Sequence, residues 1–181
     1  LFGEYGMKVV VNGRQESEAA LQEVEDIKAA GGEAIFVPAN VSKPLEAEAL
    51  VDAAVKQFGR VDILVNNVGT RRDNLIVMMK PEQVYDVVET NFYSAVFMTQ
   101  AAVKRMMRNK DPRGGSIINV SSVGEAGFPG QSIYASTKRA VEAVADVAAQ
   151  EYASREIYTS VIRPGLTDTD LVADLTAVLR T

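Results

Sequence analysis

The segment "SIINVSSVGEAGFPGQSIYASTK" (116–138) joins a predicted strand to a predicted helix through a glycine-rich loop. Two serines, Ser121 and Ser122, end the strand, and the helix begins after the loop. Within that helix, Tyr134 and Lys138 stand four residues apart, so their side chains lie on the same face. A strand that delivers polar residues to a loop and then to a helix is a building unit of α/β folds.

The same alternation of strands and helices runs along the whole chain. Short β-branched runs predict strands, and apolar residues at helical spacing predict the helices between them. We therefore predict strands at 7–12, 33–39, 61–67, 116–122 and 157–162, and helices at 16–32, 44–59, 81–108 and 132–154. Several strands are almost wholly apolar, which is typical of parallel sheets that are buried on both faces. The pattern predicts one α/β domain over 1–181, a doubly wound parallel sheet with helices on both faces.

The composition excludes several kinds of function. The chain has 181 residues, a formal net charge of −5, and neither Cys nor His. A disulfide, a thiolate nucleophile and a histidine base are therefore excluded, and we expect no metal. The acidic balance argues against a nucleic-acid surface. No apolar run approaches the roughly 18–20 residues that span a bilayer, so we expect a cytoplasmic protein without membrane contact.

Polar residues and glycines collect where the predicted strands end. Open parallel sheets bind ligands beyond the carboxyl ends of their strands. These ends are 12–14, 39–41, 66–70, 121–130 and 164–169. This coincidence is the first indication of a ligand site.

Three side-chain amides each have two interpretations. Asn66 and Asn67, followed by Gly69, either tie neighbouring loops together beside a flat ligand or form a simple turn. Asn91 falls on an apolar stripe of the helix predicted at 81–108, and a buried amide without partners costs about 1–3 kcal/mol. Asn91 is therefore either a site residue or a satisfied structural residue.

Ser, Tyr and Lys together suit the reduction of a carbonyl group without His, Cys or metal. A free tyrosine phenol has a pKa of about 10 and is a poor proton donor near neutrality, and a nearby ammonium makes such a phenol more acidic. A phenol tuned in this way serves as a general acid toward a carbonyl oxygen, and a serine hydroxyl can hydrogen-bond the same oxygen. Alone, the pair of Tyr134 and Lys138 is more typical of a solvated helix surface. The serines upstream and the position at a strand end favour the catalytic interpretation.

Four motifs, in this order, resemble the short-chain dehydrogenase/reductase family. They are "NNVG" (66–69), similar to the family's NNAG with Val68 in place of Ala, then Asn91, "YASTK" (134–138) and "RPGLTDTDL" (163–171). Each motif alone is weak, but the ordered set is specific and the resemblance covers essentially the whole chain. It implies a Rossmann-like fold. The run "TRRDNLIVMMKPEQVYDVVETN" (70–91) most resembles the 3-oxoacyl-(acyl-carrier-protein) reductase branch.

The resemblance implies a role for each residue of the catalytic set. Tyr134 is the proton donor, Lys138 activates it and binds the nicotinamide ribose, and Asn91 holds a water in a proton relay. A serine orients the substrate carbonyl. Strand register favours Ser122 for this role, whereas the usual family spacing to the tyrosine favours Ser121. We prefer Ser122, because a loop absorbs a deletion more readily than a buried strand does.

A nicotinamide cofactor is implied as well, with NADP(H) preferred and NAD(H) as the alternative. NAD would call for an acid after the strand at 7–12, whereas Arg14 suits the 2′-phosphate of NADP, and no acid occurs there before Glu16. Arg14 as a merely exposed loop residue is the other interpretation. By resemblance, the cofactor-binding residues are Asn12, Arg14, Asn40, Val41, Asn67, Val68, Gly69, Tyr134, Lys138, Pro164, Gly165, Thr167 and Thr169.

The chain departs from the family at both ends. Family members begin with a strand and a Gly-rich turn that seats the pyrophosphate. This chain opens with "LFGEYG" (1–6), which is similar to the end of the helix after that turn, and closes with "LTAVLRT" (175–181). We therefore expect an internal fragment. The absent strand would lie between those at 7–12 and 61–67, and we expect their unpaired apolar edges to make the isolated chain aggregate.

Three functions remain open. The first is an NADPH-dependent reductase of 3-oxoacyl thioesters in fatty-acid synthesis, a homotetramer by resemblance. Arg113 and Arg155 would then dock an acidic acyl-carrier protein, although a basic helix end is more often simply solvated. The second is an alcohol, sugar or polyol dehydrogenase of the same family. The third is an inert relative that acts as a binding subunit.

Overall fold

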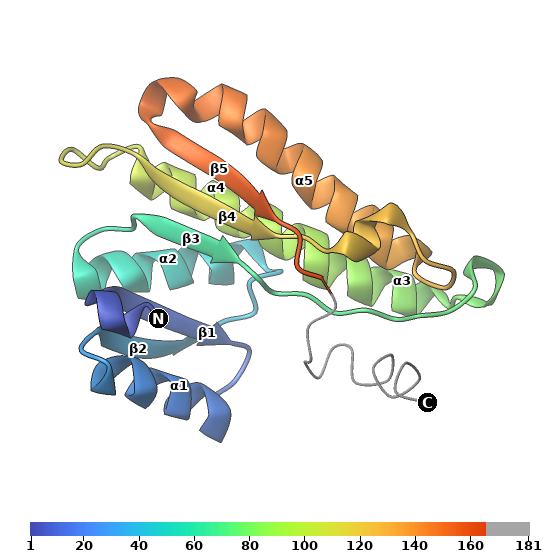
Figure 1. Ribbon diagram of the computed structural model, residues 1–181, viewed down its shortest axis with the longest axis horizontal. Helices are drawn as coiled ribbons and strands as arrows, with labels where there is room; N and C mark the ends of the chain where they lie inside the picture. Colours follow the sequence, from blue (N-terminus) through green and yellow to red (C-terminus); the bar gives the residue numbers. More distant parts are fainter. Residues whose placement is uncertain (166–181) are drawn as a thin grey trace.

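The computed structural model describes residues 1–165, except for the side chain of Glu125, and shows an α/β fold (Figure 1). The strands are β1 (Lys8–Gly13), β2 (Glu33–Pro38), β3 (Ile63–Asn66), β4 (Gly115–Val120) and β5 (Ile157–Ile162). The α-helices are α1 (Glu18–Ala29), α2 (Pro44–Phe58), α3 (Pro81–Val88), α4 (Ser94–Met106) and α5 (Ser132–Tyr152). The short helical turns are η1 (Gly3–Tyr5), η2 (Ile76–Met78), η4 (Val123–Ala126), η5 (Ala153–Arg155) and the π-helix η3 (Glu89–Tyr93). Every predicted strand and helix is present, with boundaries that differ by a few residues, except that the helix predicted at 81–108 is divided into α3 and α4.

Local sequence signals set the ends of the helices. Ser17 caps α1 by accepting a hydrogen bond from the backbone N–H of Ala20 at 3.2 Å. Pro44 occupies the first turn of α2, where its missing N–H has no intrahelical partner to lose. Gly59 ends α2 in the left-handed region at φ 88°, which disfavours a side chain. These ends agree with the helix boundaries predicted from the sequence.

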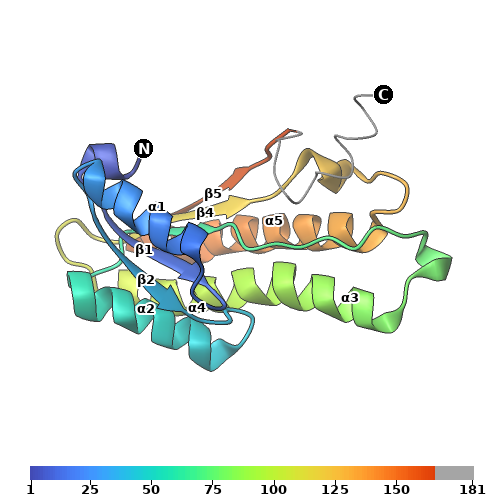
Figure 2. The same ribbon diagram turned by 90° about the horizontal axis from the view of Figure 1, so that it is seen from below.

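The strands form two parallel sheets. β1 pairs with β2, and β3, β4 and β5 pair in that order. The arrowheads of the strands all point to the same side of the molecule (Figure 1), so their carboxyl ends share one edge. Figure 2 shows α1 on one face of the strands and α2, α4 and α5 on the other. The parallel strands and the helices on both faces are confirmed.

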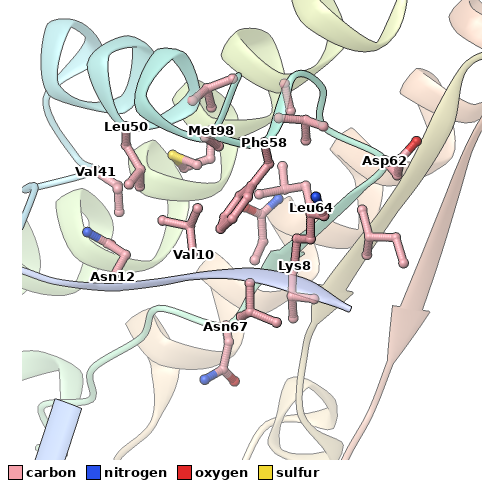
Figure 3. Close-up of a pocket in the computed structure, with 18 of the residues that line it drawn as sticks. Lys8, Val10, Asn12, Val41, Leu50, Phe58, Asp62, Leu64, Asn67 and Met98 are labelled. Carbon is pink, nitrogen blue, oxygen red and sulfur yellow. The ribbon is translucent and has the colours of Figure 1, made fainter. Parts of the chain in front are cut away.

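The facing edges of β1 and β3 make no strand pairing within residues 1–165. A cavity of about 740 Å³ separates them. Figure 3 shows Val10 of β1 and Leu64 of β3 at this cavity, together with Leu50 and Phe58 of α2 and Met98 of α4. The strand edges that were predicted to lack partners are therefore unpaired, and they face each other across an apolar space.

One hydrophobic core joins the two sheets through the helices. Met106 of α4, Ile117 of β4 and Ile157 of β5 are completely buried in it. Val10 and Val37, from β1 and β2, pack against the same cluster. This shared packing holds the two-stranded sheet beside the three-stranded one.

The helix predicted at 81–108 is interrupted by the π-helix η3, which separates α3 from α4. Such turns add a residue to the helix and occur frequently at functional sites. Asn91 lies at the centre of η3, and its side chain is buried, as the apolar stripe predicted. The interruption itself was not predicted.

Candidate active site

Polar side chains from α5 lie against the carboxyl end of β4. Lys138 donates a hydrogen bond from Nζ to the carbonyl oxygen of Val120 at 2.8 Å. The same Nζ lies 5.8 Å from the centroid of the Tyr134 ring, one helical turn earlier. Only 7% of Tyr134 and 6% of Lys138 are exposed. The pair is therefore enclosed by protein and is not a solvated helix surface, which was the alternative from the sequence.

Burial changes the acid–base behaviour of Lys138. Removal of water from the ammonium lowers the pKa of Lys138 from 10.5 to about 8. The amine is therefore mostly protonated at neutral pH but loses its proton in mildly alkaline solution. While it is protonated, it attracts any electron-rich oxygen that is placed beside it.

Asn91 ties the loop after β3 to α5. Its Oδ1 accepts a hydrogen bond from the backbone N–H of Thr70 at 2.7 Å, and its Nδ2 donates to the carbonyl oxygen of Thr70 at 2.9 Å. Nδ2 also donates to Thr137 Oγ1 at 3.1 Å. The amide, 2% exposed, is thus satisfied by protein groups. These contacts favour the structural interpretation of the side chain and place it against the helix that carries Tyr134.

The two serines at the end of β4 face different neighbours. Ser122 caps η4 by accepting a hydrogen bond from the backbone N–H of Gly124 at 3.0 Å. A Cβ placed on Gly124 would lie 3.2 Å from Ser122 Oγ and 3.4 Å from Cε1 of Tyr134, so this hydroxyl and the phenol ring border one small space. The arrangement favours Ser122 as the serine that shares a substrate oxygen with Tyr134.

Ser121 is buried beside Glu142 of α5. Arg163 holds the pKa of the Glu142 carboxyl below its usual value through hydrogen bonds of 2.8 and 2.6 Å, and the Ser121 hydroxyl adds to this effect. Ser121 Oγ makes no hydrogen bond of good geometry within the described residues. Ser121 therefore lies beside a carboxylate that is bound by Arg163.

The glycine of "NNVG" lies between two of the candidate catalytic side chains. A Cβ on Gly69 would lie 3.5 Å from Lys138 Nζ and 3.6 Å from Asn91 Oδ1. Gly69 thus presents bare backbone beside a buried cation, which suits the close approach of a flat ring. Asn67 and Val68 are exposed before it, and Figure 3 shows Asn67 near the end of the cavity between the sheets.

Asn66 has a different role. Its Nδ2 donates to Thr99 Oγ1 at 3.1 Å and to Asn119 Oδ1 at 2.9 Å. This buried amide joins β3 to β4 and α4, so it fixes the strand ends.

The cofactor-binding residues proposed at the ends of β1 and β2 divide into two kinds. Asn12 donates from Nδ2 to the carbonyl oxygens of Val37 at 2.9 Å and Ala39 at 3.2 Å, so its amide holds the two strands together. Arg14 is exposed and makes no hydrogen bond or ion pair within residues 1–165. Its guanidinium is therefore available to a phosphate.

The remaining cofactor-binding residues lie on loops or in the core. Asn40 closes a turn, because its Oδ1 accepts hydrogen bonds from Ser42 Oγ at 2.8 Å and from Ser42 N at 3.2 Å. Val41 is buried and lines the cavity. The carbonyl oxygen of Pro164 accepts a hydrogen bond from Val123 N at 3.2 Å, while the space around Gly165 is open. Thr167 and Thr169 lie outside the described residues.

One polar residue at the site was missed from the sequence. Gln131 is buried directly before α5, and its Nε2 donates to Asp73 Oδ2 at 3.3 Å. Its position three residues before Tyr134, on the same helical face, was the available signal.

Arg113 is one of several basic residues at and after the end of α4, and three of them are paired with acids. Lys104 pairs with Glu48 at 3.2 Å, and Arg105 pairs with Asp52. Arg113 lies 3.3 Å from the carboxylate of Glu156. Arg155 is exposed at the end of η5.

The sequence led us to expect neither a metal site nor a membrane-spanning helix. Among residues 1–165, no group of three or more acidic, Cys or His side chains is arranged to hold a metal ion. None of the helices in the same range is long and apolar enough to cross a membrane.

Comparison with known proteins gives consistent matches. A family model described as short chain dehydrogenase matches residues 1–179. The 3-oxoacyl-(acyl-carrier-protein) reductase of Synechocystis sp. is 41% identical over 173 residues, which cover 95% of this chain and 69% of that protein. The corresponding reductase FabG of Staphylococcus aureus is 41% identical over 177 residues, covering 97% of this chain and 69% of that protein.

A solved structure gives the same picture of the fold. A protein from Sinorhizobium meliloti, described as a short-chain alcohol dehydrogenase, superposes with a TM-score of 0.90 at 27% sequence identity. The superposition covers 98% of this chain and 69% of that chain.

Proposed function

The chain belongs to the short-chain dehydrogenase family of NAD(P)-dependent oxidoreductases, and we propose that its protein reduces the keto group of 3-oxoacyl thioesters with NADPH. The observation that carries this proposal is the meeting of Ser122, Tyr134 and Lys138 at the carboxyl end of β4. The substrate class is supported by the 41% identity to 3-oxoacyl-(acyl-carrier-protein) reductases.

In this proposal the side chains of the site bind the carbonyl oxygen of the substrate and supply the proton that it takes up. Ser122 donates a hydrogen bond to the oxygen, and Tyr134 donates the proton as negative charge develops there. Lys138, held by Val120, keeps a cation next to this charge. The nicotinamide ring, when bound, supplies the hydride. Asn91 fixes the loop at Thr70 against α5, so that the backbone at Gly69 stays open for that ring.

A preference for NADPH over NADH rests on Arg14. The guanidinium is free within the described residues, and a 2′-phosphate offers it a bidentate partner. We expect Arg14→Gln to reduce kcat/KM for NADPH by about 10-fold or more, the value of a charge-assisted hydrogen bond, and to leave NADH unaffected. Equal effects on both cofactors would refute the assignment.

The substrate is proposed to arrive on an acyl-carrier protein in the cytoplasm, in fatty-acid synthesis, with the enzyme acting as a homotetramer. Arg113 and Arg155 are proposed to meet the acidic carrier. Arg113 is already paired with Glu156, so its contribution depends on exchanging one carboxylate for another. Charge reversal at both arginines should raise KM for a carrier-bound substrate and leave KM for a short thioester unchanged.

A second candidate is the oxidation of an alcohol, favoured by the similarity to the Sinorhizobium meliloti protein. The two candidates are separated by assaying the whole protein with NADPH and a 3-oxoacyl thioester, and with NADP⁺ and simple alcohols or polyols. Faster turnover of the thioester supports the proposed function. Turnover of alcohols alone supports the second candidate, and Tyr134→Phe should abolish either activity.

A further inference from the structure

Gln131 places an unassigned polar group at the reaction centre. Its Oε1 lies 3.3 Å from the position that a Cβ on Gly124 would occupy. Ser122 Oγ and Tyr134 Cε1 lie 3.2 and 3.4 Å from the same position. The three groups therefore converge beside Gly124, where a Cβ would already be in tight contact with all three.

The orientation of the Gln131 amide follows from its neighbour Asp73. Nε2 of Gln131 donates to Asp73 Oδ2 at 3.3 Å. An ionised carboxylate only accepts hydrogen bonds, so the amide nitrogen must face Asp73 and the amide oxygen must face Gly124. Within residues 1–165, that oxygen accepts no hydrogen bond. A hydrogen-bond acceptor without a partner is therefore presented to the reaction centre.

Arg71 forms an ion pair with Asp73, although its Nη1 makes no hydrogen bond of good geometry within the described residues. Its Nη1 lies 3.1 Å from Asp73 Oδ2, the same oxygen that accepts from Gln131. Only 10% of the Arg71 side chain is exposed, whereas 34% of the Asp73 side chain is, so the pair is buried on the arginine side. The backbone adds a second link, because Asn74 N donates to the carbonyl oxygen of Gly130 at 2.8 Å. The array of Arg71, Asp73 and Gln131 thus orients one amide oxygen toward Gly124.

An amide oxygen in this position distinguishes the two oxidation states of a substrate. Ser122 and Tyr134 carry hydroxyl hydrogens, which suit the oxygen of a ketone. A ketone oxygen has no hydrogen to give to a further acceptor, whereas an alcohol has one. Building on the proposed function, we propose that Gln131 Oε1 accepts the hydroxyl hydrogen of the alcohol. Gln131 then binds the reduced form of the substrate more tightly than the ketone.

The test compares the two forms of one ligand on the whole protein. Calorimetry gives Kd for the 3-hydroxybutyryl thioester of N-acetylcysteamine in the presence of NADPH, and for the 3-oxobutyryl thioester in the presence of NADP⁺. Neither mixture can react, because the cofactor is in the wrong oxidation state. Gln131→Met removes the amide oxygen at similar size. We expect the Kd of the alcohol to rise about three- to tenfold, as for one neutral hydrogen bond, and that of the ketone to change less than about twofold.

Two further substitutions test the array. Asp73→Ala frees the Gln131 amide to rotate and should reproduce the loss of alcohol binding, whereas Asp73→Asn keeps an oxygen for Arg71 and for Gln131 and should restore it. Adding Gln131→Met to Asp73→Ala should cause no further loss, because both changes act on one oxygen. Gln150→Met is the matched control, since Gln150 lies on the exposed part of α5 and donates only to Asp146 O at 3.2 Å within the described residues.

The outcomes separate this proposal from the proposed function. Equal weakening of alcohol and ketone in Gln131→Met, or an unchanged alcohol Kd, overturns the role of Gln131 and leaves the proposed function intact. Failure of the unsubstituted protein to bind either thioester overturns the proposed substrate and the role of Gln131 with it. If Gln131→Met does not fold, the contrast between Asp73→Ala and Asp73→Asn decides, because equal alcohol Kd values in the two would overturn the proposal.

Discussion

Lys138 Nζ lies 5.8 Å from the centroid of the Tyr134 ring while it donates a hydrogen bond to the backbone of β4. The ammonium group is thus positioned by a backbone carbonyl of the strand and not by the phenol. Its positive charge can therefore act on negative charge that develops at the substrate oxygen. Lys138→Met should keep the packing and remove the charge. We expect kcat to fall about 100-fold or more, as for the loss of a group that supports general acid catalysis. Steady-state kinetics measures this, with Lys56→Met at the exposed end of α2 as the control. A fall of less than threefold would exclude the proposed role of Lys138.

The lowered pKa of Lys138 predicts how stability depends on pH. A lysine with a pKa of about 8 in the folded state and 10.5 when unfolded opposes folding while it is protonated in both states. Between these two values the unfolded chain binds more protons, so the free energy of unfolding should rise with pH, by at most about 3 kcal/mol. Urea unfolding of the whole protein at pH 7.5, below this window, and at pH 10, within it, measures the rise. Other groups titrate as well, so the comparison is with Lys138→Met, which should lack this part of the rise. Identical pH profiles for both proteins would contradict the prediction.

The different neighbours of the two serines predict opposite outcomes for two small substitutions. Ser122→Ala removes the hydroxyl that borders the space beside Tyr134, and kcat should fall about 100-fold, as when a donor to a developing oxyanion is lost. Ser121→Ala removes a hydroxyl beside Glu142 and should leave kcat within about threefold. Kinetics of both variants with one substrate decides between them. A larger loss in Ser121→Ala would assign the role to Ser121.

Asn91 should matter for stability as well as for activity. Asn91→Ala leaves the backbone groups of Thr70 without their partners and removes the bond to Thr137. We expect the free energy of unfolding to fall by about 2–4 kcal/mol, because buried polar groups are orphaned. Denaturant unfolding measures this. Thr137→Ser keeps the hydroxyl and should cost less than about 1 kcal/mol, so equal losses in both variants would argue against the network.

Part of this site can be predicted from the sequence alone. The strands, the helices and the spacing of Tyr134 and Lys138 follow from local periodicity, which needs no knowledge of distant residues. The burial of Asn91 followed from the same periodicity. The π-helix around it did not, because an interrupted helix has the same apolar pattern over short windows as a continuous one.

Other features depend on partners that lie far apart in the chain. The orientation of Gln131 is set by Asp73, and the surroundings of Ser121 are set by Glu142 and Arg163. Asn12 was assigned to the cofactor from its place at a strand end, but its amide is used by β2 and the residue after it. Such pairings are decided by which loops meet in space, and strand periodicity carries no information about that.

The unpaired edges of β1 and β3 predict how the isolated 181-residue chain behaves. Along β3, Ile63 and Val65 are 45% and 40% exposed and alternate with buried residues, and the strand edge beside them has no partner within residues 1–165. Edges of this kind recruit further strands, so we expect the isolated chain to form aggregates at micromolar concentration. Replacing Ile63 and Val65 by Lys should reduce this aggregation, because charges at a sheet edge oppose strand addition. Val77→Lys, on the exposed turn η2 away from the cavity, is the control for a general gain in solubility. Sedimentation velocity measures the distribution of species. A monodisperse monomer with a cooperative melt, or equal improvement by Val77→Lys, would show that the edges of β1 and β3 are not the cause.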